Sequence, residues 1–188
     1  AGRHGFYALV EVELDRPGAA EAVEAWLAAA MEAGLVEDGV LARSLAEAGA
    51  LWALREAVGE LDAALGPHVN FDLGTPVSDL GRFCEACDRA LAALPEAGRR
   101  LKVGHLGDGN VHLLVAHDGT DAAIAAIEHA VYGMLPDWQG AVTAEHGVGR
   151  LKRDWLPGIR SPVELETMRA LKLALDPQGL LNPGAVLV

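Results

Sequence analysis

The chain has 188 residues, of which 51% are hydrophobic, and this is enough for one sizeable core. Its formal net charge of −12 argues against binding to nucleic acid or to an anionic membrane surface, because both would repel the average field of the protein. The sequence has no apolar run near the roughly 18 residues that span a bilayer, and no basic-then-apolar secretion signal. We therefore expect one soluble, cytoplasmic domain over residues 1–188, with peripheral attachment to the inner membrane left open.

The first third of the chain is predicted to hold two strands and two helices. Residues 6–14 alternate between apolar and polar side chains, which is the period-two pattern of a half-buried strand. An Ala-rich amphipathic helix is predicted at 17–34, followed by a short strand at 39–42 and a second helix at 44–65. A chain that starts at Ala1 and enters a strand pattern almost at once is typical of a domain taken from a longer polypeptide.

The rest of the chain combines short strand patterns with capped helices. Thr75 is predicted to cap a helix that has proline in its first position, and Ser161 and Glu164 form a capping box before the last helix. The elements in order are a strand at 69–73, a helix at 75–94, paired strands at 100–106 and 111–116, a helix at 120–135, a strand at 141–145 and a helix at 161–176. This order predicts an α+β fold of the ferredoxin-like kind, with a mainly antiparallel sheet and helices packed on one face.

Two familiar motifs are absent or incomplete. The sequence has neither G-x-G-x-x-G after a strand nor G-x-x-x-x-G-K-[ST], so we expect no dinucleotide or phosphate loop in this chain. Cys84 and Cys87 form a C-x-x-C within a predicted helix, but a structural zinc needs four ligands and no second pair lies nearby. We interpret them as two small residues on a helix face, with a redox role as the minor alternative.

Two histidines flank the predicted hairpin turn at 107–110. With that turn, His105 would pair directly with His112 on one face of the ribbon, where opposed Cβ atoms lie about 4.5–5.5 Å apart. Two imidazoles at this spacing can converge on one metal ion, and a hydrogen-bonded pair beside a turn is the alternative.

A carboxylate and an imidazole end the predicted strand at 141–145. Glu145 added to two histidines gives three N/O ligands and an open position, as in a catalytic zinc site. Because neighbouring strand residues point to opposite faces, only one of Glu145 and His146 is expected to bind the metal, which leaves the other free for proton transfer.

These segments match a known family. The motifs GHLGDGNVH, TAEHGVG and LDPQGLLNPG, with the helical segment LWALRE at 51–56, resemble the C-terminal domain of FAD-linked oxidases of the vanillyl-alcohol oxidase type. The likeness extends over residues 6–188 and is to the branch of D-lactate, glycolate and D-2-hydroxyglutarate dehydrogenases.

The resemblance implies a role for each site residue. It assigns His105, His112 and Glu145 as ligands of a divalent metal, with zinc as the expected ion. It makes His146 the catalytic base beside the flavin, and Arg55 the clamp on the substrate carboxylate, which a planar guanidinium can bind in a bidentate way. Asn182 would lie near the flavin. A solvated surface charge is the alternative for Arg55, and a simple turn former for Asn182.

The resemblance also implies a reaction and partners. A D-2-hydroxy acid would be oxidised to the 2-oxo acid by hydride transfer to FAD, which is mostly held by an N-terminal FAD-binding domain or subunit outside this chain. We therefore expect this chain to be inactive alone and to need an electron acceptor. The oligomeric state, with a homodimer as one possibility, is left open.

Three departures limit the substrate prediction. The D-2-hydroxyglutarate enzymes tend to have a lysine before the strand sequence that reads Asn70-Phe71-Asp72 here, a threonine at Gly59 and an asparagine at Leu114. A smaller or more apolar hydroxy acid is therefore an alternative substrate. A metal-dependent hydrolase and a non-catalytic binding or assembly domain remain the alternative functions.

Overall fold

The structure, a computed structural model, describes residues 4–187, with the backbone alone at 61 and 62. The chain divides into two compact units between Leu61 and Asp62. Helices and a small antiparallel sheet make up the fold, which confirms the predicted α+β class. Among the described residues, no helix has both the length and the apolar character needed to cross a bilayer.

The N-terminal unit is helical. Its elements are α1 (Ala19–Glu32), α2 (Leu45–Glu56) and the 3₁₀ turn η1 (Ala57–Glu60), and α3 (Leu61–Leu65) follows at the boundary. The Ser44 hydroxyl accepts a hydrogen bond from the Glu47 backbone N–H and caps α2. Both predicted helices are confirmed. The second is shorter than expected because η1 interrupts it at Val58-Gly59, two residues with weak helix preference.

The strands predicted at 6–14 and 39–42 are wrong. Neither segment joins a sheet in the described part of the chain. The side chains at 6–14 are exposed, with Phe6 96% accessible. The alternating pattern is that of a strand with one buried face, but the N-terminal unit offers no described strand edge with which it could pair.

The C-terminal unit contains the sheet. Strands β1 (His68–Gly74), β2 (Arg100–Val103) and β3 (Asn110–Ala116) run antiparallel in the order β1-β3-β2. Ala141 adds a single antiparallel bridge to Gly74, outside β1. One strand–helix–strand passage, from β1 through α4 to β2, is followed by β3, α5 and the Ala141 bridge beside β1, which agrees with the ferredoxin-like arrangement that the sequence predicts.

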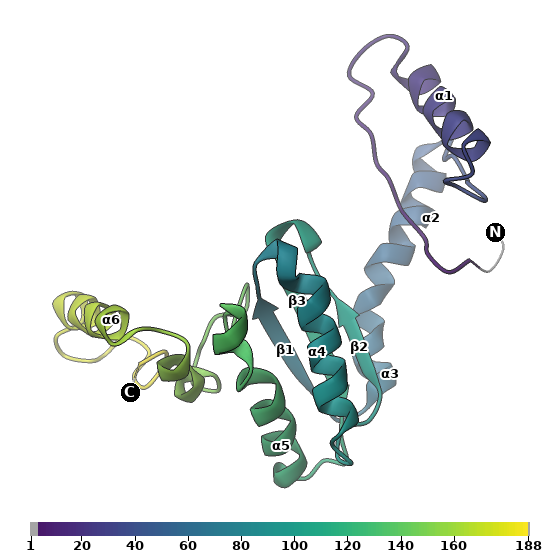
Figure 1. The fold of residues 1–188 in the computed structure, drawn as a ribbon. Helices are drawn as coiled ribbons and strands as arrows, with labels where there is room; N and C mark the ends of the chain where they lie inside the picture. The colour runs from purple at the N-terminus through teal and green to yellow at the C-terminus, as the bar shows by residue number, and fades with distance from the viewer. Residues whose placement is uncertain (1–3, 188) are drawn as a thin grey trace. The chain divides into compact units, whose positions relative to one another are not determined.

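Two helices cover one face of this sheet. They are α4 (Leu80–Ala92) and α5 (Asp121–Tyr132), seen beside the strands in Figure 1. Phe71 and Leu113 from the sheet, Phe83 from α4 and Ile127 from α5 meet in one buried cluster. Each such side chain contributes about 1.5–3 kcal/mol when it is fully buried. The opposite sheet face carries Asp72 and His112 as cross-strand partners.

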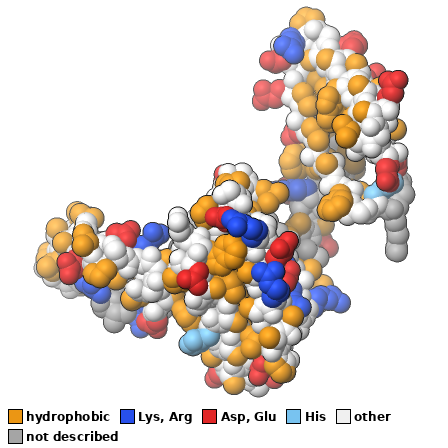
Figure 2. All heavy atoms as spheres, viewed as in Figure 1, with side chains coloured by type: hydrophobic (Ala, Val, Ile, Leu, Met, Phe, Trp, Pro, Cys, Tyr) orange, Lys and Arg blue, Asp and Glu red, His pale blue; other side chains and the backbone are white. Residues whose placement is uncertain are grey.

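The chain then runs through short turns to a capped helix. The turns are η4 (Leu135–Trp138) and η5 (Arg153–Gly158), and the helix is α6 (Pro162–Leu175). Ser161 and Glu164 form the predicted capping box, so the start of this helix is confirmed. Leu165 joins the core, whereas several apolar side chains of α6 stay exposed, and Figure 2 shows hydrophobic atoms over this end of the unit.

Two local predictions in this unit are wrong. Thr75 does not cap α4, which begins at Leu80 after the 3₁₀ turn η2 (Val77–Asp79). The Thr75 backbone N–H donates to the Gly109 carbonyl instead. The strand predicted at 141–145 shrinks to the bridge at Ala141, because the following backbone N–H groups turn towards a side chain of β1.

The hairpin is confirmed, but its register differs from the predicted one. His105 exchanges backbone hydrogen bonds with Asn110, and His112 pairs with Val103. The turn therefore occupies 106–109 and includes the 3₁₀ turn η3 (Leu106–Asp108). Because the register differs from the predicted one by two residues, His105 and His112 stay on the same face of the sheet.

Gly109 makes this turn possible. Its φ of +66° lies in the left-handed region, and an added Cβ would come within 2.0 Å of the Thr75 carbonyl oxygen. We expect Gly109→Ala to lower the free energy of unfolding of the C-terminal unit by about 2 kcal/mol or more. Gly107→Ala, in the same turn but with open space around its Cα, should change it by less than about 0.5 kcal/mol. Urea denaturation followed by circular dichroism measures both, and equal midpoints for the two variants would contradict the argument.

The two cysteines lie on α4 as free thiols. Cys87 is buried in the core, with its Sγ 3.8 Å from the Met134 Sδ, and Cys84 is half-buried. Neither belongs to a potential metal cluster in the described part of the chain. This geometry agrees with their interpretation as packing residues.

Thiol reactivity tests that interpretation. Burial raises the pKa of Cys87 to about 12, and burial also raises the pKa of Cys84. A raised pKa leaves little thiolate at pH 8, so iodoacetamide should label Cys84 faster than Cys87, by roughly tenfold or more. In denaturant the two rates should become similar. Peptide mass spectrometry over a time course measures the rates, and fast labelling of native Cys87 would contradict its buried position.

Candidate metal centre

Three predicted ligands converge on the sheet face opposite the helices. His105 precedes the hairpin turn, His112 lies on β3, and Glu145 comes from the segment after the Ala141 bridge. His105 Nε2 lies 3.4 Å from Glu145 Oε1, and His112 Nε2 lies 3.7 Å from Glu145 Oε2. The potential ligand atoms of these residues all lie within 4.8 Å of one another. The structure thus brings together all three residues that the sequence indicates as ligands.

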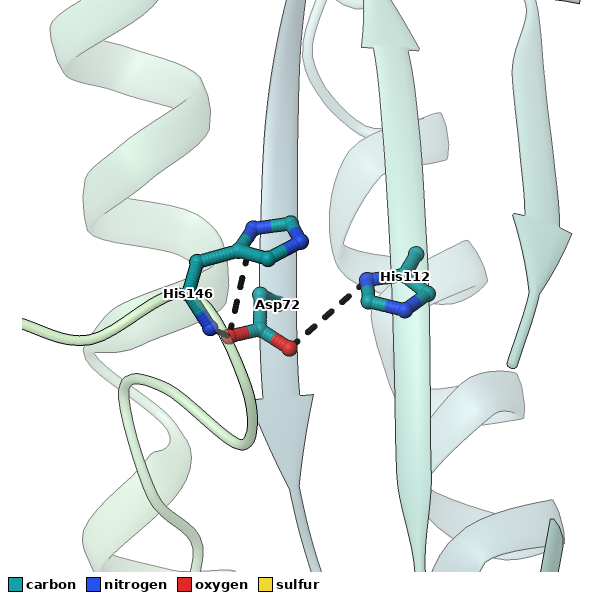
Figure 3. Close-up of side chains that lie close together, drawn as sticks. All are labelled: Asp72, His112 and His146. Carbon is teal, nitrogen blue, oxygen red and sulfur yellow. Dashed lines mark hydrogen bonds and ion pairs between the residues drawn. The ribbon is translucent and has the colours of Figure 1, made fainter. Parts of the chain in front are cut away.

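A second group of neighbouring side chains, formed by Asp72, His112 and His146, shares His112 with the three potential ligands. Figure 3 shows Asp72 between His112 and His146. Asp72 Oδ1 lies 3.6 Å from His112 Nδ1, and Asp72 Oδ2 lies 4.0 Å from His146 Nδ1. The rings of His112 and His146 stack, with centroids 5.1 Å apart and planes inclined by 16°. His146 therefore lies beside the three potential ligands, with about half of its side chain exposed.

The Asp72 carboxylate holds the segment that carries Glu145 and His146. Its Oδ2 accepts hydrogen bonds from the backbone N–H groups of 144, 145 and 146, at 2.8–3.0 Å, and from the Thr143 hydroxyl at 2.7 Å. Burial alone would raise the pKa of Asp72, but these four donors outweigh it and hold the pKa well below its usual value of 3.8. Asp72 is thus an anion that holds the segment 143–146, just after the Ala141 bridge, in place.

Asn110 supports the glutamate in a similar way. Its side chain is buried at the start of β3, and its Nδ2 donates a 2.7 Å hydrogen bond to Glu145 Oε1. With Oε1 held by this bond, the other oxygen of Glu145, Oε2, faces His112 Nε2. The sequence predicts Asn110 in a turn and assigns it no role at the site.

Sequence reasoning also missed Asp72. The available signal was a charged residue between the apolar residues Phe71 and Leu73 in a predicted strand. Buried carboxylates need several hydrogen-bond partners, so an acid at such a position indicates a specific network. The partners lie 71–74 residues further along the chain, and no local pattern connects them.

A buried ammonium group, that of Lys152, lies beside the Asp72 carboxylate. Lys152 Nζ lies 3.8 Å from Asp72 Oδ2, and only 13% of the Lys152 side chain is exposed. Burial lowers the pKa of Lys152, and the nearby Asp72 only partly offsets this. Its neighbours Arg150 and Arg153 instead donate hydrogen bonds to the carbonyls of Pro183 and Gly184. The basic run at 150–153 is therefore divided between the site and the C-terminal turn.

A cavity opens beside Glu145. Its volume is about 390 Å³. The lining residues are Gly74, Thr75, Pro76, Asp108, Asn110, Gln139, Ala141, Thr143, Ala144 and Glu145. A small molecule can therefore reach the glutamate of the candidate centre from this side.

The other two predicted site residues lie elsewhere in the chain. Arg55 is exposed in the last turn of α2 and belongs to the N-terminal unit. Asn182 is exposed, with a left-handed φ of 44°, in the turn that Arg150 and Arg153 anchor. Its backbone carbonyl accepts a hydrogen bond from the Ala185 N–H, which fits a turn former. The roles of Arg55 and Asn182 stay predictions.

Comparisons with known proteins identify the family of the chain. The chain is 38% identical over 181 residues to the mitochondrial D-2-hydroxyglutarate dehydrogenase of Bos taurus, covering 95% of this chain and 33% of that protein. It is 35% identical over 187 residues to the D-2-hydroxyglutarate dehydrogenase of Stutzerimonas stutzeri, covering 96% of this chain and 40% of that protein. The chain thus spans about a third to two fifths of the length of these curated relatives. The profile of the family described as "FAD linked oxidases, C-terminal domain" matches residues 1–186, so the chain belongs to that family.

Proposed function

We propose that this chain is the substrate- and metal-binding domain of a flavin-dependent dehydrogenase that oxidises a D-2-hydroxy acid to the 2-oxo acid. The convergence of His105, His112 and Glu145, with His146 beside them, is the observation that carries the proposal. Family membership supports it independently. We take the domain to comprise both compact units, as the sequence predicts for residues 1–188.

The donor set fits a divalent metal ion. Two imidazole nitrogens and a carboxylate oxygen are the ligands that zinc prefers in catalytic sites, where one position stays open for water or substrate. About half of the His105 and Glu145 side chains is exposed, so substrate oxygens could reach such a position. A bound ion would supply Lewis acidity that lowers the pKa of the substrate hydroxyl.

His146 is proposed to take the hydroxyl proton. Its ring is half-exposed, stacks on His112, and has its Nδ1 4.0 Å from Asp72 Oδ2, so a carboxylate faces the imidazole that would receive the proton. Arg55 would hold the substrate carboxylate through two parallel hydrogen bonds. A bound flavin, to which Asn182 is proposed to contribute, would accept the hydride.

For the substrate, we propose only the chemical class, a D-2-hydroxy acid. The relatives are named for D-2-hydroxyglutarate, which makes this diacid the first compound to test. Leu114, however, is buried and apolar two residues after His112 on β3, and Gly59 has no side chain. Neither can bind a second carboxylate, so a smaller or more apolar hydroxy acid remains the competing substrate.

The proposal includes a flavin-binding domain as partner. The relatives are about two and a half to three times longer than the part matched here. We propose that most of the flavin contacts come from such a domain, in the same polypeptide or in another subunit. The electron acceptor and the homodimer stay predictions.

Metal content tests the centre directly. Elemental analysis of the purified chain should find one divalent ion, with zinc as the expected element. His105→Ala and Glu145→Ala should each lose it, because a three-ligand site does not survive the removal of one ligand. His117→Ala removes a histidine outside the cluster and should retain the metal. Equal metal content in all four proteins would refute the proposed ligand set.

Kinetics test the base. In the protein that combines this chain with its flavin domain, His146→Ala should lower kcat for D-2-hydroxy acid oxidation by roughly 10²–10⁴-fold, as removal of a general base does. The metal content should be unchanged, because His146 is not one of the proposed ligands. Anaerobic flavin reduction, followed by absorbance, measures the rate. A variant that reduces the flavin at the parent rate would show that another group takes the proton.

A further inference from the structure

The two carboxylate oxygens of Asp72 face two different parts of the candidate centre, the segment that carries Glu145 and the ring of His112. Oδ2 accepts the four hydrogen bonds from 143–146, whereas Oδ1 faces the Nδ1 of His112 at 3.6 Å. Asp72 is fully buried, and neither Oδ1 nor His112 Nδ1 has a hydrogen-bond partner in the part of the chain that the structure describes. Two buried polar atoms without partners, slightly beyond hydrogen-bond distance of each other, can satisfy one another by a small movement.

The other nitrogen of His112 faces the opposite way. Its Nε2 lies 3.7 Å from Glu145 Oε2, on the side of the candidate metal ligands. A neutral imidazole carries one N–H, and the partner of each nitrogen decides which one holds it. A carboxylate can only accept a hydrogen bond, so Asp72 favours a proton on Nδ1 and leaves the lone pair of Nε2 free for a metal ion.

We propose that Asp72 is the positioning residue of the metal centre: through Oδ1 it fixes His112 in the Nδ1–H tautomer, and through Oδ2 it fixes the segment that presents Glu145 and His146. This inference rests on the proposed metal site and deepens it. A carboxylate behind a metal-binding histidine orients the ring and makes the ligand nitrogen more basic. Here the same carboxylate also orders the segment that supplies a second ligand.

Asp72→Asn separates the two effects. The four donors around Oδ2 require an acceptor, so the amide oxygen of asparagine should take that position and keep the 143–146 segment in place. The amide NH₂ then occupies the position of Oδ1 and donates to His112 Nδ1. His112 must accept there, so its proton moves to Nε2, where it blocks the ligand lone pair.

The tautomer is measured without any metal. Long-range ¹H–¹⁵N correlation spectra of the metal-free chain at pH 8 should show His112 protonated on Nδ1 in the parent and on Nε2 in Asp72→Asn. Thr143→Val removes one bond to Oδ2 without altering Oδ1, so it should keep the parent tautomer. An Nε2–H tautomer in the parent, or no change in the asparagine variant, would overturn the inference whether or not the chain binds metal.

Metal affinity gives the second readout. Chelator competition with Co²⁺ should show binding roughly 10–100-fold weaker in Asp72→Asn than in the parent. Asp176→Asn makes the same substitution at another buried aspartate, which accepts backbone hydrogen bonds from Leu180 and Leu181, and should bind Co²⁺ like the parent. Equal affinity in Asp72→Asn would overturn the positioning role and leave the proposed ligands intact. A parent that binds no metal, but shows the Nδ1–H tautomer, would count against the proposed function alone.

Discussion

The hydrogen bonds to Asp72 Oδ2 are the constraint on which the rest of the site depends. Three consecutive backbone N–H groups and a hydroxyl converge on one buried oxygen, so the segment after the Ala141 bridge cannot continue as a sheet strand. Buried N–H groups without an acceptor cost free energy, and a carboxylate is the strongest acceptor that the chain could place there. The early end of the strand is therefore what brings Glu145 and His146 to the histidines of the hairpin.

Local signals explain why much of the fold could be predicted. The Ser161–Glu164 capping box and the turn between the β2 and β3 patterns each depend on residues within a few positions of one another. Apolar side chains in β1 and β3 identify the sheet face that is buried, and apolar side chains of α4 and α5 pack against that face. These features were sufficient for the α+β class and for the convergence of His105 and His112.

The parts that could not be predicted depend on distant partners. Residues 6–14 have a strand pattern, but a strand also needs a neighbouring edge, and no pattern within the segment supplies one. Thr75 has the sequence position of a helix cap, but its backbone N–H donates a hydrogen bond to the carbonyl of Gly109 in the hairpin turn. Asp72 is a single charge between two apolar residues of β1, and nothing near it in sequence indicates its bonds to 143–146. In each case the decisive contact joins segments far apart in sequence.

The hairpin register has a consequence for how the length of this turn can vary. A shift of two residues moves a side chain by about 6.8 Å along a strand and returns it to the same face, whereas a shift of one residue moves it to the opposite face. For His105 or His112, that opposite face is the one packed against α4 and α5 around Leu113 and Val115. Insertions and deletions between the histidines should therefore be tolerated in pairs, and a single-residue change would bury an imidazole in the apolar core.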